Sequence, residues 1–371
     1  INMDIDFANL QLQYQKYKVE IDSKIETVLN NSNYIMGEEI NELERLLEEF
    51  TGAKYAITCS SGTDACLLAM MAINIQPGDE VITTPFTFIS TAETIALMKA
   101  KPVFVDIEPD TYNIDANLIK AAITDKTKAI IPVNLYGQPA ELDAIQNIAD
   151  KNNLKVIIDG AQSFGSIYKN KTDSNHGNIS TTSFFPAKPL GCYGDGGAVF
   201  TNNDEYAKKV KMMRVHGQNF RYQHKYIGMG GRLDTIQAAI LIAKLKYYAK
   251  ELKDRQRIAK IYTNNLSSCI KTPIIKSNRS SVWAQYTIRA NKRDELQVNL
   301  KNCGIPSAVH YPHPLHLQEC FKYLNYKHGD FPIAEKASEE VMSLPLNPFL
   351  TAKEIDYISE KLLNFFSTSD K

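Results

Sequence analysis

Short apolar runs recur between residues 53 and 201, and longer amphipathic segments separate them. The runs contain many β-branched residues and end at turn residues, as β-strands do. They are Ala56–Cys59, Glu80–Thr83, Pro102–Asp106, Lys128–Val133, Lys155–Asp159, Thr182–Phe185 and Gly197–Thr201. The helical patterns between them include Thr63–Ala72, Ser90–Lys99, Asn117–Ala122 and Leu142–Asn152. This alternation predicts an α/β fold with a large, mainly parallel seven-stranded sheet that is covered on both faces.

Helical patterns also flank this region. The first fifty residues read as helices, most clearly at Val19–Asn30 and Gly37–Thr51, and a long helical stretch runs from about Arg232 to Leu266. The remainder reads as a smaller α+β unit with segments at Val282–Asn291, Glu295–Cys303, Glu335–Met342 and Ala352–Phe366. A chain of 371 residues is long enough for about two domains. We expect a large domain over residues 1–245, which includes the N-terminal helices, and a small C-terminal domain over residues 246–371.

Composition and charge exclude several classes of protein. With 44% hydrophobic and 23% charged residues, the chain has an ordinary globular composition. Basic and acidic residues balance at 42 each, so we expect no general attraction to nucleic acid or to an anionic membrane. The six cysteines show no metal-type spacing, which suits a reducing compartment. Residues 1–20 are polar and no long apolar run occurs, so we expect a cytoplasmic protein without a membrane span.

One lysine, Lys188, lies in a turn rich in glycine and proline just beyond a predicted strand. The segment reads Ser183-Phe-Phe-Pro-Ala-Lys188-Pro-Leu-Gly-Cys-Tyr-Gly-Asp-Gly-Gly197. Such turns present side chains to a ligand more often than they bury them. A lysine before a proline is, taken alone, more often a solvated loop residue than a catalytic group. The residues that accompany Lys188 therefore decide its interpretation.

Three other strand ends carry polar or aromatic residues. Asp159 ends a strand, at the edge where parallel sheets present ligand-binding groups. A carboxylate there can pair with the pyridinium nitrogen of pyridoxal phosphate (PLP). It can equally well cap a helix that begins near Gln162. Gly62 and Thr63 lie where a strand leads into a helix, whose free N–H groups can hold a phosphate, although ordinary capping also explains them. Phe88 follows a third turn and can lie against a flat ring or in the core.

Taken in chain order, these features resemble the sugar aminotransferases of the DegT/DnrJ/EryC1/StrS family. The resemblance runs from Tyr34-Ile-Met-Gly37 through Gly62-Thr-Asp, Asp159-Gly-Ala-Gln and Ser183-Phe-Phe-Pro-Ala-Lys188 to His310-Tyr-Pro312. It implies the fold type I architecture of aspartate aminotransferase and PLP as the cofactor.

The resemblance also implies a role for each residue. Lys188 would be the catalytic group that forms the Schiff base with PLP. Asp159 would pair with the ring nitrogen, Gln162 would approach the ring hydroxyl and Phe88 would stack on the ring. The phosphate would be held by Gly62, Thr63 and Ser183.

The implied reaction moves an amino group from an amino acid, such as L-glutamate, to a keto-sugar nucleotide. Within the family, the Lys188 segment and the stretch Arg232-Leu-Asp-Thr-Ile-Gln-Ala-Ala-Ile resemble aminotransferases of UDP-2-acetamido-2-deoxy-3-oxo-glucuronic acid, which serve O-antigen (lipopolysaccharide) precursor synthesis. Arg232 is the candidate for the carboxylate of that substrate, because guanidinium offers a planar two-point contact. His310 and Tyr311 would complete the pocket. An ion pair of Arg232 at a subunit interface is an equally open reading.

One position departs from the family pattern. In Gly228-Met-Gly230-Gly-Arg232, Gly230 stands where the family commonly has an asparagine that donates to the phosphate of the neighbouring subunit. That contact is therefore in doubt, although a backbone N–H or a water molecule could replace it. The same stretch, together with Tyr34–Gly37, implies a homodimer with shared active sites.

Several other functions stay open. They are an aminotransferase for a 4-keto-6-deoxy sugar, a PLP-dependent sugar dehydratase, a NAD-dependent oxidoreductase and a non-catalytic protein that binds PLP or a nucleotide sugar. Lys188 argues against the dehydratases, which typically have His there, and the glycines at 191–197 lack the dinucleotide-binding spacing. Pro312 and Pro314 prevent a helical alignment of His310, His313 and His316, so we expect no metal. The basic and aromatic run at 216–226 reads as a surface loop rather than a nucleic-acid site.

Overall fold

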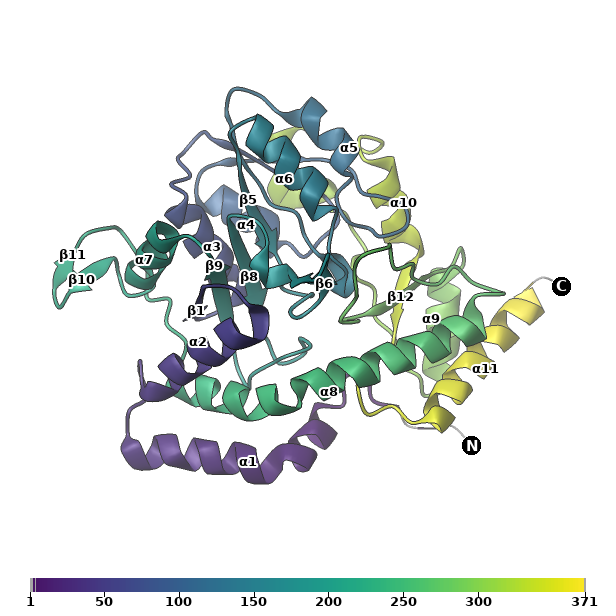
Figure 1. Ribbon diagram of the computed structural model, residues 1–371. Helices are drawn as coiled ribbons and strands as arrows, with labels where there is room; N and C mark the ends of the chain where they lie inside the picture. Colours follow the sequence, from purple (N-terminus) through teal and green to yellow (C-terminus); the bar gives the residue numbers. More distant parts are fainter. Residues whose placement is uncertain (1–2, 4, 370–371) are drawn as a thin grey trace.

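One seven-stranded sheet forms the centre of the molecule in the computed structural model, which describes residue 3 and residues 5–369 (Figure 1). The strand order is β1-β9-β8-β5-β4-β2-β3, and only β9 runs antiparallel to its neighbours in this sheet. The bounds are β1 Tyr55–Cys59, β2 Glu80–Thr83, β3 Lys101–Phe104, β4 Thr127–Ile130, β5 Lys155–Asp159, β8 Ile179–Ser183 and β9 Gly197–Thr201. The predicted α/β class with a mainly parallel sheet is confirmed.

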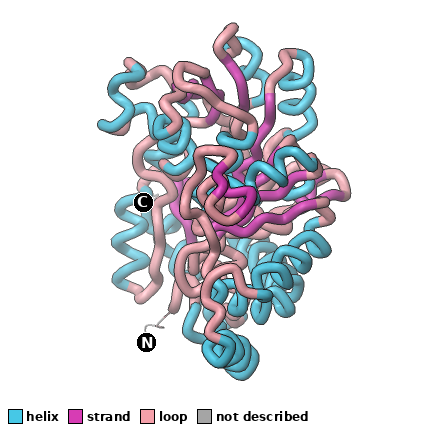
Figure 2. The backbone as a smooth tube through the Cα atoms, turned by 90° about the vertical axis from the view of Figure 1, so that its left-hand side faces the viewer, coloured by secondary structure: helices cyan, strands magenta, loops and turns pink. Residues whose placement is uncertain are grey.

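Helices cover both faces of the sheet (Figures 1 and 2). Alternate strand residues point to opposite faces, so Ile57 and Val199 pack with α3 and α7, whereas Ala56 and Phe200 pack with α2 and α8. Two-sided burial explains why the strands read as nearly continuous apolar runs. The helix bounds are α1 Leu10–Asn31, α2 Glu38–Thr51, α3 Gly62–Ala72, α4 Ser90–Leu97, α5 Ala116–Ile119, α6 Leu142–Lys151, α7 Asp204–Met213 and α8 Thr235–Leu266.

The sixth predicted strand was placed too late in the chain. The sequence pattern favoured Thr182–Phe185, but β8 spans Ile179–Ser183 and the chain turns at Phe184. The strand is made largely of hydroxyl residues, and two of them donate to backbone carbonyl oxygens: Thr181 to Ile158 and Thr182 to Gly160. Such residues can be buried in a strand without an apolar pattern to reveal them.

The C-terminal part contains a two-stranded antiparallel sheet and three helices. Their bounds are β12 Tyr286–Arg289, β13 Val341–Leu344, α9 Arg293–Asn302, α10 Pro332–Glu340 and α11 Ala352–Ser369. Short pairs β6 Ile167–Tyr168 with β7 Lys171–Thr172, and β10 Gln218–Phe220 with β11 Gln223–His224, complete the strands. The β10–β11 hairpin projects from the body of the molecule at the left of Figure 1. Brief 3₁₀ turns occur at Lys120–Ala122, Leu135–Gly137, Asp173–Asn175, Leu315–Leu317 and Glu319–Leu324.

Helix α8 connects the large sheet to the C-terminal part, and residue 245 lies inside it. The beginning of the chain also reaches the C-terminal part: Ile5 is buried in its core, and the Asn347 side chain donates to the carbonyl oxygen of Asp6 at 3.1 Å. The two ends of the described chain lie on the same side of the molecule (Figures 1 and 2). A division into domains at 1–245 and 246–371 stays a prediction.

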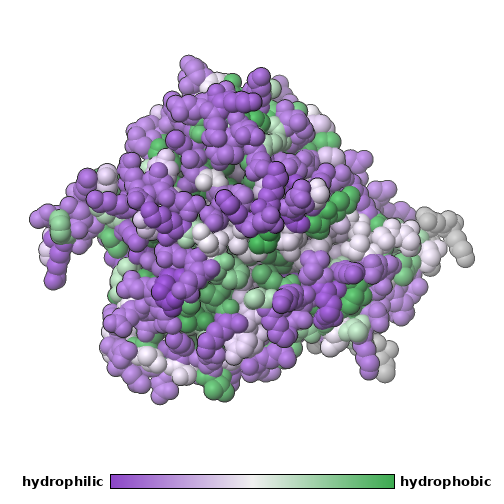
Figure 3. Space-filling model, viewed as in Figure 1, coloured by the Kyte–Doolittle hydropathy of each residue, from purple (hydrophilic) through white to green (hydrophobic). Residues whose placement is uncertain are grey.

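Polar residues cover most of the face drawn in Figure 3, and hydrophobic residues gather toward its middle. Within the described residues, no helix has both the length and the apolar character needed to cross a bilayer.

Candidate active site

The candidate residues meet at the carboxyl edge of the large sheet. Asp159 ends β5, Ser183 ends the neighbouring parallel strand β8, and β1 leads directly into α3 at Gly62. Parallel strands bring their carboxyl ends to one edge, which is where such sheets bind ligands. The turn that follows β8 carries Lys188.

Lys188 is half-buried at this edge. Burial lowers the pKa of the Lys188 amine, and the nearby Asp159 carboxylate partly opposes that shift. No described residue accepts a hydrogen bond from its Nζ, so the amine is available to a ligand. The turn itself is firmly held: the Lys188 N–H donates to Phe185 at 2.8 Å, and the Cys192 N–H donates to Phe184 at 2.8 Å.

Asp159 is buried and keeps both carboxylate oxygens in hydrogen bonds. The Thr91 hydroxyl donates to Oδ2 at 2.7 Å, and the Ala161 N–H donates to Oδ1 at 3.1 Å. The carboxylate therefore holds the turn that follows β5; no helix begins there, so the helix-capping interpretation was wrong. The Asp159 charge also lies close enough to Lys188 to influence its pKa. Sequence reasoning missed Thr91, which lies on α4; its only sequence signal is a threonine-rich stretch at 83–94.

Gln162 connects the large sheet to the C-terminal part. The Tyr136 N–H donates to its Oε1 at 2.7 Å, and its Nε2 donates to the Tyr311 hydroxyl at 3.0 Å. The Tyr136 hydroxyl in turn donates to the carbonyl oxygen of His310. Tyr136 was also missed, because nothing in the sequence indicates that its backbone takes up a left-handed conformation, with φ at 59°.

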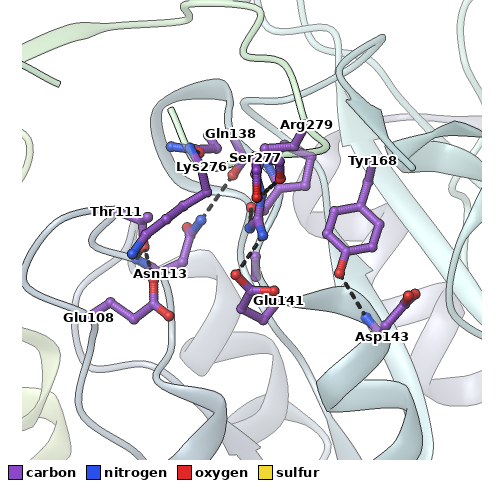
Figure 4. Close-up of polar contacts among 12 residues, drawn as sticks. Glu108, Thr111, Asn113, Gln138, Glu141, Asp143, Tyr168, Lys276, Ser277 and Arg279 are labelled. Carbon is purple, nitrogen blue, oxygen red and sulfur yellow. Dashed lines mark hydrogen bonds and ion pairs between the residues drawn. The ribbon is translucent and has the colours of Figure 1, made fainter. Parts of the chain in front are cut away.

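Gln138, two residues after Tyr136, contacts the segment at residues 274–279, which follows α8 in the chain; Figure 4 shows Gln138 beside Lys276, Ser277 and Arg279 of that segment. The side chain of Gln138 accepts from the Lys276 N–H at 2.8 Å and donates to Ile274 at 2.9 Å, so it pairs with that segment much as a strand would. The Asn113 side chain donates to the Gln138 carbonyl at 3.0 Å, and Arg279 forms an ion pair with Glu141. These contacts hold the backbone that presents its N–H to Gln162.

His310 lies close enough to Lys188 for their charges to interact. Burial first, and then the Lys188 charge, lower the pKa of His310 to about 4, so the imidazole is neutral near pH 7. Its Nδ1 is 3.0 Å from the Ser343 hydroxyl.

His316 does not lie beside His310; it is buried elsewhere, and its Nε2 is 2.9 Å from the Glu335 carboxylate. The described residues contain no cluster of His, Cys, Asp and Glu side chains arranged to hold a metal ion.

The start of α3, with Gly62 and Thr63, packs closely against Ser183 at the end of β8, and we call these three residues the cradle. A Cβ atom added to Gly62 would lie 2.6 Å from the Cβ of Ser183, so a residue with a side chain does not fit there. Ser61 caps α3 by accepting from the Asp64 N–H at 3.0 Å. In the described part of the chain, the N–H groups of Gly62 and Thr63 find no acceptor. Two free N–H groups at a helix start, beside the Ser183 hydroxyl, suit a phosphate.

Phe88 lies in the site rather than in the core. Its side chain is 54% exposed, and its ring centroid is 6.3 Å from that of Tyr311. Tyr311 in turn contacts Gln162, so the exposed Phe88 ring lies near that part of the site, where it can lie against a flat ligand.

Arg232 is not joined to these residues. Its guanidinium has no hydrogen bond or ion pair with the residues that the structure describes. The preceding Gly231 nevertheless borders the cradle, because its carbonyl accepts from the Ser60 N–H at 3.0 Å. The stretch at Gly228–Arg232 therefore lies near the cradle of its own chain, and the Arg232 side chain at its end is half-buried.

The described residues fit PLP. Free N–H groups and a hydroxyl suit its phosphate, a buried carboxylate suits its pyridinium nitrogen, an exposed aromatic suits its ring, and an unpartnered amine of lowered pKa suits its aldehyde.

Comparison with known proteins agrees with this geometry. The sequence profile of the DegT/DnrJ/EryC1/StrS aminotransferase family matches residues 15–363. The chain is 50% identical to the UDP-2-acetamido-2-deoxy-3-oxo-D-glucuronate aminotransferase of Pseudomonas aeruginosa, over 97% of this chain and 100% of that protein. It is 46% identical to a pleiotropic regulatory protein of Geobacillus stearothermophilus, over 98% of this chain and 99% of that protein.

A solved structure gives the same picture of the fold. The NtdA protein of Bacillus subtilis with bound cofactor PMP superposes with a TM-score of 0.92 at 30% identity, covering 99% of this chain and 86% of that one.

Proposed function

The chain belongs to the DegT/DnrJ/EryC1/StrS aminotransferase family and is a PLP-dependent enzyme of nucleotide-sugar amination, and we propose that its substrate is UDP-2-acetamido-2-deoxy-3-oxo-glucuronic acid. The observation that carries this substrate is the 50% identity, over nearly the whole length of both chains, to a Pseudomonas aeruginosa enzyme of that specificity. L-glutamate is the proposed amino donor. When bound, PLP supplies the carbonyl that takes up the amino group and a ring that withdraws electrons from the reacting carbon.

We infer which residues would hold the cofactor. Lys188 would hold it covalently through Nζ, and the Gly62 and Thr63 N–H groups with the Ser183 hydroxyl would hold the phosphate. Asp159 would pair with the ring nitrogen, since its fixed carboxylate would stabilise a protonated pyridinium. Gln162 would keep one donor for the ring hydroxyl, and Phe88 would stack on the ring.

Lys188 would also move the proton, once the amino group of the donor has displaced it from the cofactor and freed its amine. Its amine lies in a site whose burial lowers its pKa, so the neutral form that accepts a proton is more available than in water. A single amine can remove the α-proton of the donor amino acid and, in the second half of the reaction, deliver a proton to the sugar carbon that receives the amino group. His310 is neutral beside it and therefore does not repel the protonated amine.

The substrate carries a carboxylate besides its diphosphate, and the pocket needs a cation for it. Arg232 is the proposed partner, because its guanidinium is free within the chain and suits a carboxylate. His310 and Tyr311, which reach the site from the C-terminal part, are the proposed contacts to the sugar.

We propose that two chains form a homodimer with shared sites. The Tyr34–Gly37 stretch pairs with the start of α8: the Thr235 N–H donates to Tyr34 at 3.0 Å, and the Gly37 N–H donates to the Thr235 hydroxyl at 3.1 Å. The apolar side chains of this stretch are largely exposed, with Tyr34 at 45% and Ile35 at 52%. Exposed apolar residues are typical of a subunit interface. Because these residues lie beside Arg232, such an interface would bring Arg232 to the active site of the partner chain.

The proposed setting is the cytoplasm, in the synthesis of O-antigen precursors of lipopolysaccharide. Activated nucleotide sugars and free thiols both suit that compartment.

An assay with purified enzyme tests the substrate. L-glutamate is supplied with either UDP-2-acetamido-2-deoxy-3-oxo-glucuronic acid or a 4-keto-6-deoxy nucleotide sugar, and amino-sugar formation is measured, with Lys188→Ala as the inactive control. We expect turnover of the uronic acid. Preference for the 6-deoxy sugar, which has a methyl group in place of the carboxylate, would contradict the substrate but not the cofactor chemistry. Inactivity with both sugars, in a protein that still binds PLP, would favour a non-catalytic binding protein.

A further inference from the structure

Three polar residues recur at intervals of seven along the otherwise apolar inner part of α8. They are Gln237, Lys244 and Glu251, and the last two are each only 3% exposed. Seven residues make almost two full turns of an α-helix, so the three side chains lie on one face. We call them the polar stripe of α8. Burying charged groups costs free energy unless they have partners, so the partners indicate what the stripe does.

Gln237 holds the end of the turn that carries Lys188. Its Oε1 accepts from the Tyr193 N–H at 2.8 Å, and its Nε2 donates to the Tyr193 carbonyl at 3.2 Å. One side chain thus satisfies both backbone groups of a loop residue. The adjacent Gly194 approaches so closely that an added Cβ would lie 2.9 Å from the Gln237 amide nitrogen.

Lys244 holds the middle of the same turn. Its Nζ donates to the carbonyl oxygen of Gly191 and lies 5.2 Å from the centre of the Tyr193 ring. Gly191 is itself confined, because an added Cβ would lie 2.4 Å from the Pro186 carbonyl oxygen. Lys244 therefore holds the backbone of Gly191, which is itself packed tightly against Pro186 in the Pro186–Lys188 part of the turn. Burial lowers the pKa of Lys244 to about 8, against the attraction of Glu251.

Glu251 supplies the opposite charge and connects the stripe to α1. Gln13 donates to both of its oxygens at 3.0 Å, and the Tyr17 hydroxyl donates at 2.9 Å. The α1 side of the stripe reaches the turn as well, since the rings of Tyr14 and Tyr193 meet edge to face at 6.1 Å.

We propose that Lys244 and Gln237 are positioning residues for Lys188, which fix the Gly191–Gly194 part of its turn to α8 and so determine where the Lys188 amine lies. This inference rests on the proposed role of Lys188. Neither residue is placed in the cofactor or substrate contacts described above; both act through the backbone of the turn.

The test uses the holoenzyme and the variants Lys244→Met and Gln237→Leu. Lys244→Met keeps the apolar stem and removes the donor and the charge, and Gln237→Leu removes both contacts to Tyr193. A displacement of about 1 Å at a reacting group costs up to about a hundredfold in rate, so we expect kcat to fall at least about tenfold in each variant. We expect KM for the sugar to change by less than about twofold, because no substrate contact is altered. The pH midpoint of the cofactor absorbance, which reports the amine bound to it, should also shift.

Lys250→Met is the matched control, since Lys250 lies on the same helix with its side chain 76% exposed and forms an ion pair with Asp254. Lys244→Arg keeps the charge and donors and should recover part of kcat. If Gln237→Leu and any folded Lys244→Met both match Lys250→Met in kcat and in absorbance midpoint, the positioning role is wrong. A failure of the positioning role can be distinguished from a failure of the proposed function. Borohydride reduction fixes the cofactor to its lysine, and peptide mass analysis then identifies that lysine. If the cofactor is attached to a residue other than Lys188, the proposed function is wrong.

Discussion

Lys188 combines two properties that a surface lysine lacks. It is open enough to meet a ligand, and burial nevertheless lowers the pKa of its amine. The residue before it and the proline after it belong to a turn held by its own backbone hydrogen bonds and by α8, so the side chain itself is not needed to hold the turn together.

Lys188→Ala should abolish amino transfer and leave the fold intact. The variant removes the proposed covalent partner of the cofactor and the amine proposed to move the proton, but it removes little packing. Activity is measured with the keto-sugar and L-glutamate, and folding by thermal melting. Near wild-type turnover in this variant would mean that Lys188 is not the catalytic residue.

Asp159→Asn should keep bound cofactor but lose most activity. An amide can preserve the hydrogen bonds with Thr91 and Ala161, yet it cannot stabilise a positive charge on the ring nitrogen. We expect kcat to fall by about a hundredfold or more, as is typical when a key electrostatic contact is lost. Absorbance gives the cofactor content of the same sample. Unchanged steady-state activity would falsify the assigned role of Asp159.

Asp173 is a buried carboxyl group whose titration should be visible in stability. It accepts from the Ser163 hydroxyl at 2.5 Å and from the Gly165 N–H at 3.2 Å, and burial raises its pKa to about 7 from an ordinary value of 3.8. The folded state then holds a proton that the unfolded state has released. The contribution of this group to stability is therefore full below about pH 4 and is lost as the pH rises to about 7.

Asp173→Asn should remove that pH dependence. An amide retains both hydrogen bonds and does not ionise, so the free energy of unfolding of the variant relative to wild type should grow by about 3 kcal/mol between about pH 5 and about pH 8. Urea unfolding of the cofactor-free protein measures it. The control is Asp143→Asn, a change at an exposed ion pair with Lys169 that should alter the difference by less than about 1 kcal/mol. An equal effect of Asp173→Asn at both pH values would show that Asp173 is ionised throughout.

At the scale of elements, sequence patterns located the helices and most strands well. Apolar runs mark strands that are buried on both faces, which is why β2, β5 and β9 appear at their predicted bounds. The pattern misled at β8, because Thr181 and Thr182 are buried with their hydroxyls donating to the carbonyl oxygens of Ile158 and Gly160, and no apolar pattern reveals them. The aromatic pair after it was read as strand, but Phe185 is 51% exposed in the turn.

Gly62→Ala should weaken cofactor binding by pushing α3 and β8 apart. The added methyl group would lie 2.6 Å from the Ser183 Cβ, where both elements border the proposed phosphate site. We expect the Kd for PLP to rise at least about tenfold, since displaced N–H groups lose a charge-assisted contact. Cofactor titration of the apoprotein measures it.

Gly78→Ala is the matched control for this change. Gly78 has open space around it but a left-handed φ of 88°, so its substitution costs stability without touching the cradle. A loss of PLP affinity in Gly78→Ala equal to that in Gly62→Ala would mean that the effect is general destabilisation.

At the scale of the whole molecule, the free guanidinium of Arg232 and the exposed Tyr34–Gly37 stretch suggest a site completed by a second chain. Mixing Lys188→Ala with Arg232→Ala chains tests this. If Arg232 serves the partner's site, a mixed dimer has one site with both residues intact, and random exchange should restore about a quarter of wild-type activity. Each variant alone is the control. No recovery in mixtures that are shown to exchange subunits would rule out a shared site.

The sequence by itself determined the class of fold, the order of its elements and the identity of the residues at the strand ends. It could do so because the period of apolar residues and the chemistry of turns are local properties. Local turns also singled out Lys188, Asp159 and Gly62 as candidates, whereas Gln162 and the role of each residue came from the resemblance to the family.

Only the tertiary structure decided what surrounds those residues. Thr91, Tyr136 and the polar stripe of α8 act through contacts with segments far away in the chain, such as Thr91 with Asp159 and Lys244 with Gly191. No local pattern specifies which distant backbone group a buried side chain will meet. Burial likewise sets the pKa values of Lys188, His310 and Asp173, because it depends on how the whole chain packs around them.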